Sequence, residues 1–161
     1  MSMQILRIEP KDYDSVLALN KEFVPHVNLI DARELQWFVD HAACARVLKI
    51  DDRVAGFLIG LRPGLKYASP NYQWFCDNYD DFAYIDRVVV STWARRQGVA
   101  DALYAAFISS QSDAPVMTCE VNIRPSNEGS MLFHKRMGFH QVSSQEIDDG
   151  RKEVALMEKA I

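Results

Sequence analysis

The segment with the clearest chemical meaning is a basic turn that contains a glycine: Arg95, Arg96, Gln97, Gly98, Val99 and Ala100. It follows a β-branched run that predicts a buried strand: Val88, Val89 and Val90. Beyond the turn, apolar residues recur at helical spacing, so the turn opens into a helix. A helix N-terminus carries unpaired N–H groups and the positive end of the helix dipole. With two arginines beside it, this turn is predicted to bind a diphosphate.

A glutamate at the centre of a later strand is a candidate general base. In the stretch 117–122, alternation places Thr118, Glu120 and Asn122 on one face. Polar side chains in the middle of a covered strand are costly unless they face a wet cleft. Glu120 could therefore take a proton from a reacting group. The alternative is an ordinary solvated glutamate, or a carboxylate paired with Arg87 or Arg124.

Asp86 competes with Glu120 for the role of base. It precedes the basic turn on the valine strand and shares a face with Tyr84, Val88 and Val90. The alternative for Asp86 is an ion pair with a neighbouring arginine.

Two motifs together indicate a family. The first is Arg95-x-x-Gly98-x-Ala100, and the second joins Asn127, Ser130, Phe133 and His134 to a Gly-Phe pair at 138–139. Their order and spacing resemble the GCN5-related N-acetyltransferase (GNAT) superfamily. The resemblance implies binding of acetyl-CoA and direct transfer of its acetyl group to an amine, without a covalent enzyme intermediate. It also implies that a backbone amide near Val88 holds the thioester oxygen and that pantetheine lies along residues 88–90.

The resemblance assigns further roles. Glu120 stands where the ribosomal-protein N-acetyltransferases of the superfamily have a base. His134 replaces the tyrosine that is thought to protonate the departing thiolate, and imidazole, with a pKa of ~6.5, can do the same work. A lone helical histidine can equally be structural. Asn127 is either a helix cap or a cofactor contact, and Ser130 and Phe133 are expected near the cofactor.

These residues need a framework of strands and helices. Periodicity and turn signals predict strands and helices in the order β-α-α-β-β-β-α-β-α-β-β, with an aromatic loop over 66–81 and terminal strands at 140–147 and 152–159. Asp12 and Asp31 are expected to cap the first two helices. The resemblance implies the same α/β order, with a mixed sheet splayed between its fourth and fifth strands to hold acyl-CoA.

Composition limits the remaining possibilities. A chain of 161 residues predicts one domain over 1–161, and its net charge of −4 argues against nucleic acid as a partner. The sequence has no long apolar run, so we expect a cytoplasmic protein without a membrane partner. Three cysteines and four histidines lack metal-site spacing, so no metal is predicted.

The aromatic loop has three open interpretations. With nearby aspartates, its rings could enclose a cationic amine; alternatively it is a hydrophobic flap over the core or a contact in a homodimer. The sequence thus predicts an acetyl-CoA-dependent N-acetyltransferase acting on a small-molecule amine or a peptide N-terminus. The alternative is a non-catalytic module that binds acyl-CoA as a sensor or interaction partner.

Overall fold

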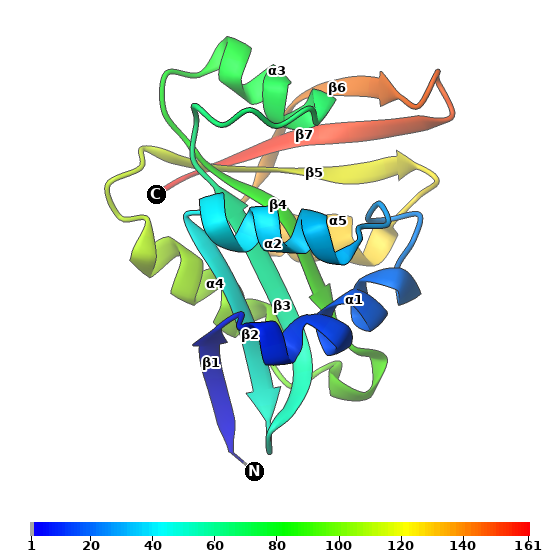
Figure 1. Cartoon of the computed structure of the whole chain (residues 1–161). Coiled ribbons are helices and arrows are strands. Elements are labelled where there is room, and N and C mark those ends of the chain that lie inside the picture. The colour runs from blue at the N-terminus through cyan, green and yellow to red at the C-terminus, as the bar shows by residue number, and fades with distance from the viewer. Residues whose placement is uncertain (1) are drawn as a thin grey trace. The chain divides into compact units, whose positions relative to one another are not determined.

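A computed structural model describes residues 2–161 (Figure 1). Seven strands form one sheet in the order β1-β2-β3-β4-β5-β7-β6. The strands are β1 (Met3–Arg7), β2 (Cys44–Ile50), β3 (Arg53–Leu61), β4 (Ala83–Val90), β5 (Val116–Arg124), β6 (His140–Ile147) and β7 (Lys152–Ala160). The helices are α1 (Tyr13–Glu22), α2 (Ala32–His41), α3 (Pro70–Asn78), α4 (Val99–Ser110) and α5 (Glu128–Arg136), with short 3-10 turns at Pro10–Asp12 and Thr92–Ala94.

The chain divides into two compact units. Unit 1 holds the residues up to Leu61 together with Asp86–Gln111, and unit 2 holds Arg62–Ile85 together with Ser112–Ile161. Strand β4 therefore contributes its first part to unit 2 and its last part to unit 1. The prediction of one domain over the whole chain stays a prediction.

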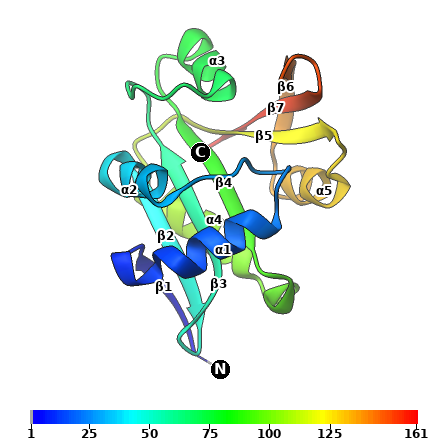
Figure 2. The ribbon, with the colours of Figure 1, turned by 45° about the vertical axis from the view of Figure 1, so that its right-hand side comes forward.

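Unit 1 is a three-stranded antiparallel meander covered by helices. Strand β1 pairs with β2, and β2 pairs with β3 through a tight turn in which Asp51 and Asp52 both have positive φ. Helices α1 and α2 lie on one face of these strands and α4 on the other (Figures 1 and 2). The valines, leucines and phenylalanines of β2 and β3 fill the space between the helices, where Val47, Leu48, Phe57 and Leu58 are fully buried.

The two predicted helix caps of unit 1 behave differently. Asp31 and Glu34 form the expected capping box at the start of α2, with the Glu34 N–H donating to the Asp31 carboxylate at 2.8 Å. Asp12 precedes α1, but its side chain does not cap that helix. Its buried carboxylate instead accepts from the Glu9 N–H at 3.0 Å and pairs with Lys49 Nζ at 2.8 Å.

Unit 2 combines the other strands with α3 and α5. Strand β7 pairs antiparallel with both β5 and β6, while β4 and β5 run parallel at Ala83↔Met117 and Tyr84↔Thr118. Helix α5 packs against β5 (Figure 2). Two hydrogen bonds join this part of the chain to the terminal strands: Gln145 donates to Asn71 of α3 at 2.9 Å, and Tyr79, directly after α3, donates to Glu158 at 2.6 Å.

The predicted order of elements is confirmed with one error. The aromatic segment predicted as a loop contains α3, a helix whose Ser69 side chain accepts from the Tyr72 N–H at 3.3 Å and whose first residue is Pro70. Tyr72 and Phe75 are fully buried against Phe82. The helix forms because a serine cap and a proline start it, and because its apolar face covers the core as the flap interpretation expected. The predicted splay between β4 and β5 stays a prediction.

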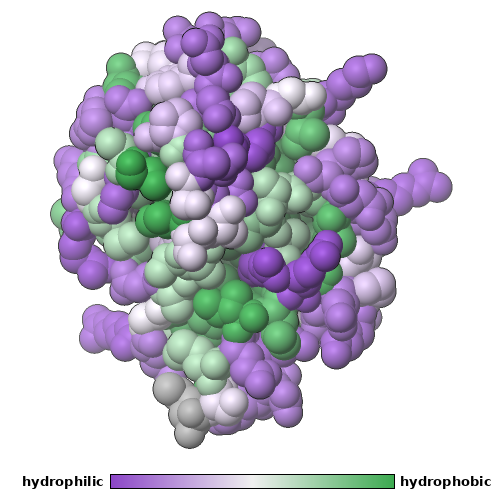
Figure 3. Space-filling view, turned by 90° about the vertical axis from the view of Figure 1, so that its left-hand side faces the viewer, coloured by the Kyte–Doolittle hydropathy of each residue, from purple (hydrophilic) through white to green (hydrophobic). Residues whose placement is uncertain are grey.

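The surface mixes polar and apolar groups. On the face drawn in Figure 3, hydrophobic side chains reach the surface between hydrophilic ones. Leu132 and Leu29 are the most exposed of the large apolar side chains, at 68% and 60%. Within residues 2–161, no helix is long and apolar enough to span a membrane.

Candidate functional site

The basic turn of unit 1 ends at the start of α4 and has the form expected of an anion site. Gly98 is the N-cap residue with φ 77° and ψ 19°, a left-handed conformation that favours glycine. The first helical hydrogen bond runs from the Ala102 N–H to the Gly98 carbonyl at 3.0 Å. The N–H groups of Val99 and Ala100 lie before that bond and so have no partner within the helix. A Cβ at Gly98 would meet no atom within 4 Å, so the approach to the turn is open.

Close packing fixes this turn within unit 1. A Cβ at Gly56 of β3 would lie 2.8 Å from the Val89 carbonyl oxygen and 2.9 Å from Val99 Cγ1. The Ser91 N–H donates to the Ala55 carbonyl at 2.8 Å. Strand β3 therefore touches both the end of β4 and the start of α4, which holds the connecting turn in place.

The polar side chains of the turn are exposed. Arg95 and Arg96 both reach solvent, and the Arg95 guanidinium lies 5.8 Å from the centre of the Phe23 ring. The Gln97 side chain donates to the Trp93 carbonyl at 3.3 Å, a hydrogen bond between two residues of the same turn. On β4, Val89 is buried while Val88 and Val90 are half-buried.

Asp86 is held in a buried ion pair. Its carboxylate accepts from Arg87 Nε at 2.7 Å, and the two side chains are only 3% and 2% exposed. Arg87 also donates to Asn20 Oδ1 at 3.0 Å and to Asn28 Oδ1 at 2.7 Å. The ion-pair interpretation of Asp86 is thus confirmed. Protonating this carboxylate would remove its charge from the buried pair with Arg87, which argues against Asp86 as the base.

Glu120 has a different partner, and that partner was not predicted. In unit 2, Tyr84 donates its hydroxyl to Glu120 Oε2 at 2.7 Å. Tyr84 is fully buried and Glu120 is half-buried. A hydroxyl that donates to a carboxylate favours its ionised form, which is the form that a general base needs.

The predicted alternation along β5 is confirmed, but the face that carries Thr118 and Glu120 is more buried than expected. Met117, Cys119 and Val121, on the opposite face, are buried, and burial raises the pKa of the Cys119 thiol well above its usual value. Thr118, two residues before Glu120, is also fully buried. Among the described residues, its hydroxyl has no hydrogen-bond partner.

His134 lies in the last part of α5 and is buried, at 4% exposed. Its Nδ1 lies 2.7 Å from the Ser130 carbonyl oxygen, and its ring packs edge-on against Phe133 and Phe139. A carbonyl oxygen only accepts, so Nδ1 carries the proton and Nε2 is the acceptor of the neutral ring. Burial lowers the pKa of His134, so the neutral ring is favoured at neutral pH.

The other residues of the second motif build the start of α5. Asn127 Oδ1 accepts from the Ser130 N–H at 3.3 Å, which confirms the capping role of Asn127. Phe133 is half-buried, and the Arg136 guanidinium lies 5.3 Å from its ring centre. A cofactor contact by Asn127, Ser130 or Phe133 stays a prediction.

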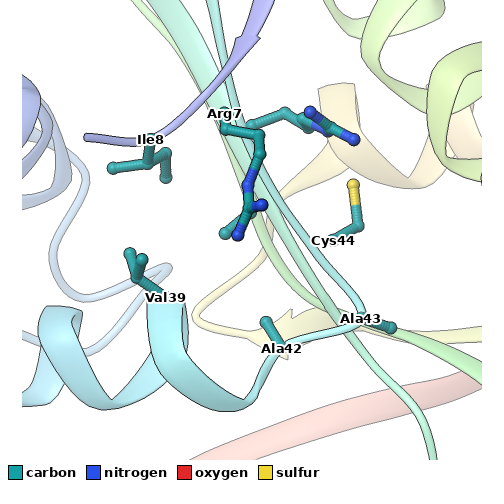
Figure 4. Close-up of a pocket in the computed structure, with 8 residues that line it drawn as sticks. Arg7, Ile8, Val39, Ala42, Ala43 and Cys44 are labelled. Carbon is teal, nitrogen blue, oxygen red and sulfur yellow. The ribbon is translucent and has the colours of Figure 1, made fainter.

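A hollow of about 220 Å³ in unit 1 lies apart from these residues. Its lining includes Arg7 and Ile8 of β1, Val39 of α2 and Cys44 of β2 (Figure 4). The Arg7 side chain extends among the other labelled residues (Figure 4). No predicted site residue lines this hollow. Within residues 2–161, no group of three side chains is placed to hold a metal ion.

The sheet and the order of the helices match the fold that the resemblance implied. The profile of the acetyltransferase (GNAT) family matches residues 8–139. The chain belongs to this family and is an acyltransferase. No curated protein matches the sequence.

Solved structures show the same fold at low sequence identity. Ard1 from Thermoplasma volcanium has a TM-score of 0.77 and 20% identity, covering 100% of this chain and 99% of that one. The ribosomal-protein-S18-alanine N-acetyltransferase from Escherichia coli has a TM-score of 0.74 and 16% identity, covering 99% and 94%. Naa50 from Arabidopsis thaliana, in complex with the bisubstrate analogue CoA-Ac-MVNAL, has a TM-score of 0.74 and 14% identity, covering 100% of both chains.

Proposed function

We propose that this chain is an acetyl-CoA-dependent N-acetyltransferase that acts on the primary amine of a small molecule or of a peptide N-terminus. The observation that carries the proposal is Glu120, a half-buried carboxylate in the middle of β5 that the Tyr84 hydroxyl holds at 2.7 Å. The bisubstrate complex of the Arabidopsis Naa50 supports both the cosubstrate and a peptide acceptor. The family match supports transfer of an acetyl group.

In the proposed complex, the basic turn binds the diphosphate of acetyl-CoA. The N–H groups of Val99 and Ala100 and the positive end of the α4 dipole would face the phosphate oxygens. Arg95 and Arg96 would add charge, since both are exposed at this turn. The pantetheine arm would hydrogen-bond along Val88–Val90.

The proposed reaction is direct attack. Glu120 takes a proton from the substrate ammonium, directly or through a water, and the freed nitrogen attacks the thioester carbon. The C–N bond forms, the C–S bond breaks, and the CoA thiolate leaves with the electron pair and takes up a proton. The products are the amide, the CoA thiol and one released proton.

The proposed proton donor to the thiolate is His134, which can act only when its ring is protonated at Nε2. With Nδ1 donating to the Ser130 carbonyl, only Nε2 could deliver a proton, and the neutral ring has none there. Because burial lowers the pKa of His134, the ring would have to be protonated before it could act as an acid. Any turnover that depends on this donor should decline as the pH rises through the lowered pKa.

A thiol-release assay tests the proposal. Acetyl-CoA is incubated with the protein and a panel of small amines and peptides, and each peptide is matched by an N-acetylated copy as control. We expect thiol release with at least one free amine and none with its blocked copy. Calorimetric binding of acetyl-CoA without thiol release from any amine would instead support the non-catalytic acyl-CoA-binding module.

A further inference from the structure

Helix α3 packs directly on the tyrosine that holds Glu120. The ring centres of Tyr72 and Phe75 lie 5.5 and 5.8 Å from that of Tyr84, and all three side chains are fully buried. The Tyr72 and Tyr84 rings meet at 65°, an edge-on contact that aromatic pairs prefer. The position of the Tyr84 ring, and so of its hydroxyl, therefore depends on where α3 holds Tyr72.

Tyr72 is itself anchored at its far end. Its hydroxyl donates to the Arg62 carbonyl at 2.7 Å and accepts from the Leu65 N–H at 3.1 Å. Burial raises the pKa of Tyr72 to about 12, so it remains a protonated donor at neutral pH. The anchor continues to Arg62, whose guanidinium pairs with Asp81 at 2.8 Å and with Asp113 at 2.9 Å.

We propose that Tyr72 is a positioning residue for the base, acting through Tyr84. The anchored ring of Tyr72 fixes the Tyr84 ring so that its hydroxyl stays within 2.7 Å of Glu120 Oε2. Hydrogen bonds weaken steeply when their geometry departs from the optimum, so a small displacement of Tyr84 weakens the support of the carboxylate. This inference rests on the proposed function, in which Glu120 is the base.

The test compares two hydroxyl deletions in the same aromatic cluster. Tyr72→Phe keeps the ring and removes the anchor. Tyr79→Phe is the matched control, because its ring lies 5.6 Å from Phe75 while its hydroxyl bonds to Glu158. We expect Tyr72→Phe to move the acid limb of the kcat/KM profile to higher pH, with a loss of about 2- to 10-fold on that limb, the range of one hydrogen bond. Tyr79→Phe should leave the limb in place.

A double-variant comparison shows whether the effect passes through Tyr84. In a Tyr84→Phe background, adding Tyr72→Phe should cause no further shift of the acid limb. The inference is overturned if Tyr72→Phe shifts the limb no more than the control, or if its full shift persists without the Tyr84 hydroxyl. Should thermal melts show that Tyr72→Phe does not fold, Ser69→Ala replaces it, because it weakens the α3 cap that accepts the Tyr72 N–H.

The outcome also separates this inference from the proposed function. If Glu120→Gln retains wild-type turnover, Glu120 is not the base, so the base assignment and the role of Tyr72 both fail, while thiol release with a free amine still supports an N-acetyltransferase. If Glu120→Gln is inactive at neutral pH while Tyr72→Phe matches Tyr79→Phe, the base assignment stands and the role of Tyr72 is refuted.

Discussion

Replacing Glu120 with glutamine removes the proposed base while preserving its hydrogen bond. The glutamine carbonyl can still accept the Tyr84 hydroxyl that lies 2.7 Å from Glu120 Oε2, so the local packing should persist. Glutamine cannot take a proton near neutrality. General-base catalysis typically contributes ~10²- to 10⁴-fold, so turnover at pH 7 should fall by that factor, with the affinity for acetyl-CoA nearly unchanged.

The pH dependence of the remaining activity should identify the class of amine. Without a base, only the neutral amine reacts, so the rate of Glu120→Gln should rise with pH until the amine has lost its proton. That midpoint should lie near pH ~8 for a peptide N-terminus and near ~10.4 for a lysine-like alkylamine. Steady-state kinetics from pH 6 to 10 with a confirmed acceptor would separate the two classes, because the rate levels off within this range only for a peptide N-terminus.

A matched control comes from the same unit. Glu158 also accepts a tyrosine hydroxyl, that of Tyr79 at 2.6 Å, and lies on the neighbouring strand β7. Glu158→Gln should retain the wild-type profile, because this glutamate has no proposed role in the reaction. A Glu120→Gln enzyme with wild-type turnover at every pH would refute the assignment of Glu120 as the base.

Three further predictions test other parts of the argument. Gly98→Asp should weaken acetyl-CoA binding in calorimetry far more than Gly98→Asn, because the two side chains match in shape and only aspartate brings a negative charge to the turn; equal affinities would exclude a diphosphate there. Arg87→Met should lower the free energy of unfolding by about 3–5 kcal/mol in urea titrations, because it removes the guanidinium from a buried ion pair with Asp86. A loss below about 1 kcal/mol would mean that the pair contributes little to stability. His134→Phe should reduce turnover more than His134→Tyr if His134 protonates the thiolate. Burial lowers the pKa of His134 in the folded protein, so the stability of the wild-type protein should also fall as the pH drops from ~6.5 through the lowered pKa. Thermal melts of His134→Phe over the same pH range should lack this pH-dependent loss of stability.

The fold was largely predictable because its periodic signals were local. The valine strand, the Asp31 capping box and the glycine turn each depend on neighbours in the sequence, and each lies where it was predicted. Helix α3 was mistaken for a loop because aromatic residues carry little helical preference, even though Ser69 and Pro70 supplied a start signal. Its stability comes from tertiary burial of Tyr72, which no local pattern shows.

Only part of the candidate site could be predicted from the sequence, because the rest depends on contacts between distant segments. Glu120 and the turn could be found from alternation and from motif spacing. The pairing of Tyr84 with Glu120 depends on the register of two parallel strands, Tyr84↔Thr118, that are far apart in the sequence. Likewise, the sequence predicted only that Asp86 could pair with a neighbouring arginine. The structure identifies that arginine as Arg87, whose guanidinium is also held by Asn20 and Asn28.

The tight contact at Gly56 affects how mutational data on this enzyme should be read. Gly56 is not a predicted site residue, yet any side chain there would collide with the Val89 carbonyl and with Val99. Such a collision would displace the two segments that flank the basic turn. In a saturation scan scored by activity, position 56 should therefore group with the residues of the proposed diphosphate site, although its constraint comes entirely from packing.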